Sequence, residues 1–112
     1  MTVTEKLQEM GVTLPSVAAP LASYVPAKRV GDQVWTSGQL PFVDGELPAA
    51  GKVGAEVTTE KATELARTAA LNALAAIDSE VGLDNVTQVL KVTGFVASAP
   101  DYTQQPAVIN GA

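Results

Sequence analysis

Four consecutive residues, Thr36-Ser37-Gly38-Gln39, combine side-chain types that could hold a small ligand. They lie in the second of two predicted strands. A glycine inside a strand gives up side-chain packing, and it often marks the close approach of a ligand or of another backbone. Gly38 fits a β-bulge equally well. The hydroxyl groups and the amide that flank this glycine make the stretch the first place to expect a binding site.

The chemistry of this stretch is limited by two absences. The chain contains no histidine and no cysteine, and these residues supply most general bases near neutral pH and most zinc ligands. Ser37 has no such base to activate it, so it is a poor nucleophile. Catalysis would have to use carboxylates, backbone groups, tyrosine, arginine, amides or bound water.

The composition is typical of a single folded domain. The chain has 112 residues, of which 46% are hydrophobic and 17% are charged. The net charge of −5, with no basic cluster beyond Lys28-Arg29, argues against nucleic-acid binding. The polar N-terminus does not resemble a signal peptide, and no apolar run is long enough to span a membrane. We therefore expect a cytoplasmic protein with no membrane partner.

Local signals predict a short helix and a hairpin in the first 40 residues. A capping-box pattern predicts a helix over residues 2–10. Two strands, roughly 24–30 and 33–40, are expected around a tight turn at Gly31-Asp32. Pro26 cannot donate to a ladder, so it should lie at a sheet edge or in a bulge.

The most regular helical pattern covers residues 59–80. Thr58 fits an N-cap and Gly82 is a natural stop. Apolar side chains recur along one face, and several are alanines, so the helix can approach a sheet closely. The face consists of residues 62, 65, 66, 69, 70, 73, 74 and 77. Leu71 lies opposite this face, where it is either a lone exposed leucine or a contact with another subunit.

Residues 86–97 predict a long strand that is apolar on both faces. Such strands are usually central and covered on both sides. The long helix can cover one face, and another subunit is the economical cover for the second. A second helix is expected from Pro100, with Asp101 as its cap. This element order calls for further strands, so we expect the C-terminal strands of the domain to be missing here.

Four segments carry more specific signals. They are Tyr24 with the turn at Gly31-Asp32 and Thr36–Gln39; Ala69–Ile77, AALNALAAI; Leu83–Val96; and Val108-Ile109-Asn110. In this order they resemble the reactive intermediate deaminase family, which is called RidA or YjgF-like and labelled endoribonuclease L-PSP. The N-terminal helix and the long loop at 98–106 resemble the longer-chain branch of that family.

The resemblance implies an α+β, chorismate-mutase-like fold, in which a mixed sheet packs two helices on one face. It implies a homotrimer whose sheets form a central barrel, with the sites in clefts between subunits. Better-known relatives hydrolyse reactive 2-imino acids, or their enamine tautomers, to 2-keto acids and ammonia. No metal and no organic cofactor is implied. Residues 1–112 would form one such domain, with helix 2–10 as an extension.

The resemblance also implies the substrate-binding residues, which are Tyr24, Ser37, Gly38, Gln39 and Asn110. Each has a structural alternative. Tyr24 fits an aromatic residue beside a subunit interface, Asn110 fits a polar helix terminus, and Ser37 and Gln39 fit hydrogen-bonding roles in a sheet or an interface. The family's carboxylate-binding arginine and water-placing glutamate have no counterpart in this sequence, so no catalytic residue is assigned.

Three functions are compatible with these observations. An imine or enamine deaminase, acting on a small imino acid, is the first expectation. The alternative is a non-catalytic trimer that binds small carboxylates or keto acids in the same clefts. Ribonuclease activity, which the family label suggests, is the least expected because the chain is acidic and has no histidine and no basic groove.

Overall fold

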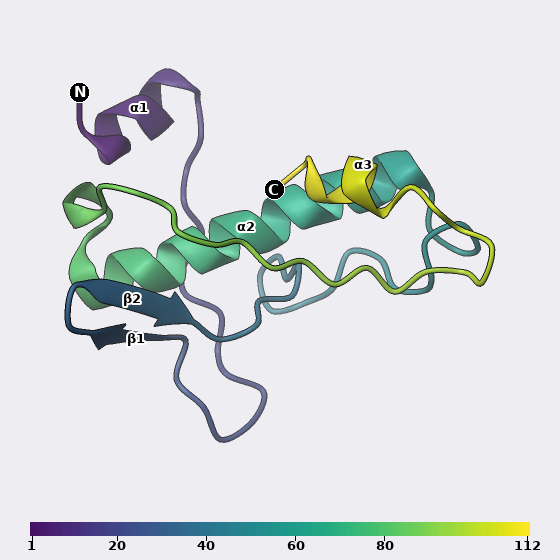
Figure 1. The fold of residues 1–112 in the computed structure, drawn as a ribbon, viewed down its shortest axis with the longest axis horizontal. Helices are drawn as coiled ribbons and strands as arrows, with labels where there is room; N and C mark the ends of the chain where they lie inside the picture. Colours follow the sequence, from purple (N-terminus) through teal and green to yellow (C-terminus); the bar gives the residue numbers. More distant parts are fainter.

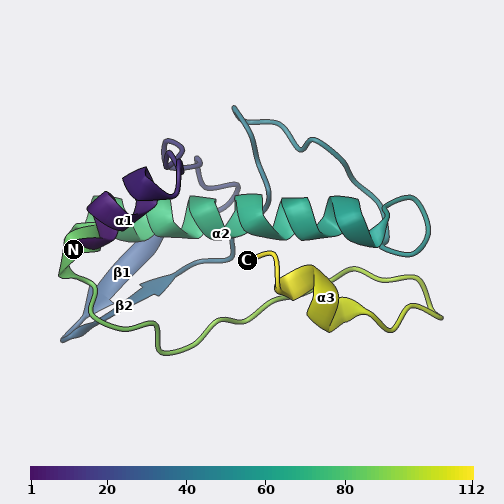
Figure 2. The ribbon, with the colours of Figure 1, turned by 90° about the horizontal axis from the view of Figure 1, so that it is seen from above.

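A computed structural model describes residues 1–112 (Figure 1). The elements are α1 (Val3–Glu9), β1 (Ala27–Val30), β2 (Gln33–Thr36), α2 (Thr59–Val81), the 3-10 helix η1 (Leu83–Asn85) and α3 (Gln105–Ile109). Figure 2 shows the hairpin, residues 86–97 and α3 on the same side of the long helix α2. This arrangement confirms the α+β class. None of the helices is both long and apolar enough to cross a membrane.

The short helix α1 begins where the capping box predicts. The Thr2 hydroxyl oxygen accepts a hydrogen bond from Glu5 N at 3.1 Å, and Thr2 N donates to the Glu5 carboxylate at 3.4 Å. Such reciprocal bonds satisfy two backbone donors that the first turn leaves free. The helix buries none of its residues. Its link to the rest of the fold is a hydrogen bond from Thr4 N to Asp84 Oδ1 at 2.8 Å.

This link predicts a pH-dependent attachment of α1. Hydrogen bonds from the backbone and then the side chain of Thr4 hold the pKa of the Asp84 carboxyl below its ordinary value of 3.8. Because the folded-state pKa is depressed, the attachment is at full strength above that ordinary value and weakens as the pH falls through the lower folded pKa. At neutral pH, the Asp84→Ala variant should lose protection of the Thr4 amide against hydrogen exchange, measured by NMR.

The matched control for this variant is Asp101→Ala, which removes another exposed carboxylate. It should leave protection of the Thr4 amide unchanged. In strong acid, protection in the parent chain should approach that of Asp84→Ala. Equal protection in the parent and Asp84→Ala at neutral pH would contradict the attachment.

The hairpin is shorter than the sequence predicts. β1 and β2 pair antiparallel from Ala27 opposite Thr36 to Val30 opposite Gln33. The turn is where it was expected, and Gly31 adopts a positive φ of 59° there, a conformation that a residue without Cβ tolerates best. The strands expected over 24–30 and 33–40 thus each lose several residues at the open end of the hairpin.

Pro26 explains where the ladder stops. Proline has no N–H to donate, so pairing cannot continue through it on that side. Its carbonyl oxygen still accepts a hydrogen bond from Ser37 N at 2.9 Å. Gly38 follows that last bond and lies outside the sheet, so its interpretation as a β-bulge is wrong.

Helix α2 is confirmed with its caps. Thr58 Oγ1 accepts from Lys61 N at 3.1 Å, and Gly82 ends the helix with a φ of 77°. The buried face differs in part from the predicted one, because it consists of Ala62, Asn72, Ala75 and Ala76. The chain that follows β2 packs against the middle of the helix, and this contact shifts burial toward Asn72.

Residues 86–97 do not form the predicted strand within this chain. The segment is extended, but residues 86–96 pair with no other strand. The side chains of Val89, Leu90 and Val92 are each 67% exposed, and Phe95 is 93% exposed. A strand needs a neighbour to satisfy its N–H and C=O groups, and the chain offers none here. The mixed sheet is therefore reduced to the two antiparallel strands of the hairpin.

Helix α3 packs against α2 at the end remote from the hairpin, and it makes no comparable contact with β1 or β2. Two helices on one face of a sheet are thus not seen within the chain. The helix starts at Gln105, with Gln104 rather than Asp101 at the N-cap and no side-chain cap. Its Val108 completes a small core with Val53, Val57 and Ala62.

Candidate functional site

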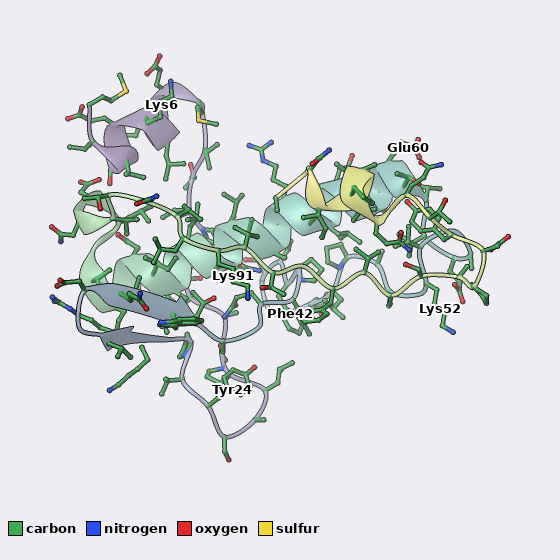
Figure 3. The ribbon with its side chains drawn as sticks, viewed as in Figure 1. Lys6, Tyr24, Phe42, Lys52, Glu60 and Lys91 are labelled. Carbon is green, nitrogen blue, oxygen red and sulfur yellow. The ribbon has the colours of Figure 1, made fainter.

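Three of the predicted site residues line one small hollow. Tyr24, Gly38 and Gln39 share it with seven apolar residues, namely Ala18, Ala19, Pro20, Leu21, Pro26, Leu40 and Phe42. Its volume is ≈ 20 Å³, which is room for about one water molecule. Figure 3 shows Tyr24 on the loop before β1 and Phe42 beyond β2. The hairpin therefore brings together residues that lie on both sides of it in the sequence.

Tyr24 is held by its hydroxyl group. The phenol oxygen accepts a hydrogen bond from Leu21 N at 3.1 Å, and the side chain is 41% exposed. The phenol proton has no acceptor within the chain that would compete with a ligand. A hydroxyl group that is oriented by one bond and retains its own donor is suited to bind a polar ligand atom.

Ser37 and Gln39 belong to the same hydrogen-bonded group. The Ser37 hydroxyl donates to Pro26 O at 3.3 Å, and Gln39 Nε2 donates to Ser37 Oγ at 3.4 Å. The serine thus organises the loop, and no basic group activates it as a nucleophile. The amide oxygen of Gln39 faces no such constraint and is free to accept a bond from a ligand.

Gly38 presents open backbone. A Cβ atom built on it meets no heavy atom within 4 Å, and its φ is not positive. Because the conformation does not require glycine, the missing side chain leaves room beside the backbone for another molecule. Gly38 is exposed, so this geometry is compatible with its ligand-facing role, which stays a prediction.

Asn72 was not predicted as part of this site. Its side chain is 2% exposed, and Nδ2 donates to Leu40 O at 2.9 Å and to Phe42 O at 3.1 Å. Both carbonyl groups belong to residues that line the hollow. The signal in the sequence was a single amide inside the otherwise apolar run AALNALAAI. A polar residue at such a position needs a partner when buried.

Asn110 lies away from the hollow. It is exposed at the end of α3, where its backbone N–H donates to Pro106 O at 3.0 Å. Neither arginine lines the hollow either. Arg29 donates through Nε to Gly31 O at 2.9 Å, and Arg67 is exposed on α2. One chain therefore unites four of the five predicted residues and leaves Asn110 apart.

A second hollow of ≈ 610 Å³ lies beside the first. Residues 13–19, the turn at Asp44-Gly45 and the middle of α2 enclose it. Leu71, expected to be exposed or in contact with another subunit, is half-buried in its wall. Asn72 and Phe42 also line this hollow, and Phe42 is one of four residues that line both hollows, with Ala18, Ala19 and Leu21.

The carboxylates do not gather into a catalytic or metal-binding group. No cluster of three or more Asp and Glu residues is arranged to hold a metal ion. Glu56 accepts a hydrogen bond from Lys52 N at 3.0 Å. Hydrogen bonds from its own backbone and from Lys52 hold the pKa of this exposed carboxyl below its ordinary value of 4.5. It is therefore ionised near neutral pH and unsuited to act as a general acid there.

Comparisons with known proteins agree with this fold. The model of the family described as "YjgF/chorismate mutase-like, putative endoribonuclease" matches residues 4–112. Protein TCP17 of Trypanosoma cruzi is 39% identical over 111 residues, which are 98% of this chain and 69% of that protein.

Two crystal structures are also similar to this chain. Atu1372 from Agrobacterium tumefaciens, a protein of unknown function, is 37% identical with a TM-score of 0.83 over 96% of this chain. The chain spans only 65% of the length of Atu1372. A "putative endoribonuclease" from Shewanella oneidensis MR-1 is 31% identical with a TM-score of 0.86, over 99% of this chain and 74% of that one. This chain therefore belongs to the YjgF/chorismate mutase-like family.

Proposed function

We propose that Tyr24, Gly38 and Gln39 form one wall of a site between copies of the chain, and that the assembled site binds a small 2-imino acid and hydrolyses it to a 2-keto acid and ammonia. The hollow within one chain has room for about one water molecule, so the substrate would lie against its rim. The observation that carries the proposal is the shared hollow, in which a phenol, an amide and open glycine backbone converge. The resemblance to the reactive intermediate deaminases supports the same function, whereas the matching family model and the Shewanella oneidensis structure are described as a putative endoribonuclease.

The reaction suits a site without histidine or cysteine. Water adds to the carbon of the C=N bond, and the nitrogen takes up a proton. The resulting carbinolamine then loses ammonia as its hydroxyl oxygen becomes the keto oxygen. A protonated imine is already electrophilic, so the protein must chiefly place the water and hold the substrate. The Tyr24 hydroxyl and the Gln39 amide offer donors and acceptors for that purpose.

We also propose that a neighbouring copy of the chain completes the site in a homotrimer. Two observations support this assembly. Asn110 is exposed and lies apart from the hollow, so it can join the other four residues only from another copy. Residues 86–97 leave a row of apolar side chains in solvent, and exposed apolar patches of this kind mark interaction surfaces. The substrate carboxylate also needs a cationic side chain to bind it. No charged side chain lines the hollow in one chain, so a neighbouring copy would have to supply it.

The deciding experiment measures ammonia release from a 2-imino acid generated in situ, with 2-oxobutanoate as the probe for binding. Release above the uncatalysed rate supports the deaminase. A rise in melting temperature with 2-oxobutanoate, without release of ammonia, would replace it with the binding protein considered above. If the chain shows neither ammonia release nor a shift in melting temperature, the proposed site is overturned.

Gly38→Ala is the sharpest variant for this test. Its Cβ meets nothing within the chain, so the free energy of unfolding should change by less than about 0.5 kcal/mol. The methyl group would instead occupy the space proposed for the ligand, and kcat/KM should fall at least about tenfold, equivalent to about 1.4 kcal/mol. If the parent chain deaminates the imino acid and Gly38→Ala has the same kcat/KM, then Gly38 does not face the substrate.

A further inference from the structure

We infer that Asn72 is a positioning residue for the ligand site. Its amide holds the backbone at Leu40 and Phe42, and through that backbone it fixes Gly38 and Gln39. The identity of the ligand rests on the proposed function. The positioning itself can be measured without turnover.

The contacts of Asn72 are those of a buried clamp. It is the buried polar residue of the chain, in the middle of α2, and both of its bonds go to segment 40–42. The two acceptors lie 32 and 30 residues away in the sequence. Burying an amide is costly unless its donors are paired. The stability of the fold around Asn72 therefore depends on segment 40–42 staying where its carbonyl groups can accept these bonds.

The clamped segment is itself tightly turned. Phe42 N donates to Leu40 O at 2.9 Å, which closes a three-residue turn around Pro41. Proline fixes its own φ and stiffens such a turn. Leu40 O therefore accepts two hydrogen bonds, one from the turn and one from Asn72. The amide binds a preformed turn rather than a loose strand end.

This clamp bears directly on the candidate site. Segment 37–42 has no helix or ladder of its own, and its fixed points lie at its two ends. Ser37 is bonded to Pro26 at one end, and the Pro41 turn is bonded to Asn72 at the other. Gly38 and Gln39 lie between the two; the Cβ position of Gly38 meets no other atom within 4 Å, and the side chain of Gln39 bonds to Ser37. Loss of the Asn72 clamp should therefore release these two residues.

The amide contributes to stability as well as to the geometry of the loop. Ala75 and Ala76 are apolar and buried on the same helix, whereas an apolar residue at position 72 would leave the carbonyl groups of Leu40 and Phe42 without this donor, which costs stability. An apolar residue also cannot hold the carbonyl oxygens of Leu40 and Phe42 in one fixed position, because it has no donor to bond them. The structure thus assigns Asn72 to the geometry of the loop.

The test compares Asn72→Leu with Asn72→Gln and with Leu83→Ala. Leucine removes both donors, and glutamine keeps them on a longer side chain. Leu83 is buried in η1 and lines neither hollow, so Leu83→Ala is a control for loss of stability. The readouts are ¹⁵N order parameters at Gly38 and Gln39, and KM and kcat for a 2-imino acid.

We expect Asn72→Leu to lower the backbone ¹⁵N order parameters at Gly38 and Gln39 from about 0.85, the value of rigid backbone, to below about 0.6. In that variant KM should rise about tenfold, with a smaller change in kcat. Asn72→Gln should recover part of both effects, and Leu83→Ala should show neither. Unchanged order parameters in Asn72→Leu would overturn the inference. A parent chain that neither turns over the imino acid nor binds 2-oxobutanoate would overturn the proposed function, while the order parameters still decide the role of Asn72.

Discussion

Replacing Phe95 with lysine is expected to lower the association constant between copies of the chain by at least about tenfold. The effect would be larger in the proposed homotrimer, where the residue would lie at each of the interfaces. Phe95 is 93% exposed in a single chain. Burying such a side chain contributes about 1.5–3 kcal/mol, which corresponds to about 10- to 150-fold in an association constant. Phe95→Lys forfeits this gain and adds a charge that must be desolvated on assembly.

The measurement is sedimentation velocity over a range of concentrations. The parent chain should form a species larger than a monomer, and Phe95→Lys should shift the equilibrium toward monomer. Met10→Lys is the matched control, because Met10 is also an exposed apolar residue, 60% exposed, but it follows α1 rather than lying in residues 86–97. A monomeric parent, or an equal shift in Met10→Lys, would contradict the assignment of residues 86–97 to an interface.

The predictions that held depend on interactions within a few residues. The caps at Thr2 and Thr58, the turn at Gly31 and the stop at Gly82 each follow from a local hydrogen bond or a local backbone conformation. Such features are fixed by the residues that form them. They located α1, α2 and the hairpin turn to within one or two residues.

The predictions that failed depend on partners that are distant in sequence. The apolar pattern of residues 86–97 describes what the segment would bury, but a ladder needs a second backbone. Asn72 is buried because segment 40–42 covers it, and no periodic pattern in α2 contains that information. Tyr24 and Gly38 were each singled out in the sequence. Their shared hollow arises only when the hairpin brings residues 18–26 against 38–42.

Replacing Gly54 with alanine is expected to lower stability strongly. Its φ is 90°, and a Cβ atom built there would lie 2.7 Å from Tyr102 Cδ1 and 3.1 Å from Tyr102 Cβ. Tyr102 packs against the core of Val53 and Val57, and its hydroxyl pairs with Thr59 Oγ1 at 2.7 Å. A methyl group at residue 54 would therefore push on a side chain that joins the core to the start of α2.

Two penalties combine in Gly54→Ala. A non-glycine residue held at an unfavourable positive φ costs of order 1–3 kcal/mol, and overpacking a fitted site costs about 1–3 kcal/mol more. We expect the free energy of unfolding in urea to fall by about 2–6 kcal/mol. Gly45→Ala separates the two causes, because Gly45 has a φ of 82° with nothing within 4 Å of its Cβ position. It should show the backbone penalty alone.

A double-mutant cycle with Tyr102→Ala isolates the contact. Without the ring, the Gly54→Ala substitution should cost no more than Gly45→Ala, because only the backbone strain is left. An additive cycle, with the same cost in both backgrounds, would show that the ring moves aside freely. That result would contradict the close fit of Tyr102 between Gly54 and the Val53–Val57 core. A non-additive cycle, in which Tyr102→Ala removes the extra cost of Gly54→Ala, is the expected result. It would show that the absence of a side chain at Gly54 lets the loop before α2 pack directly against the segment leading to α3.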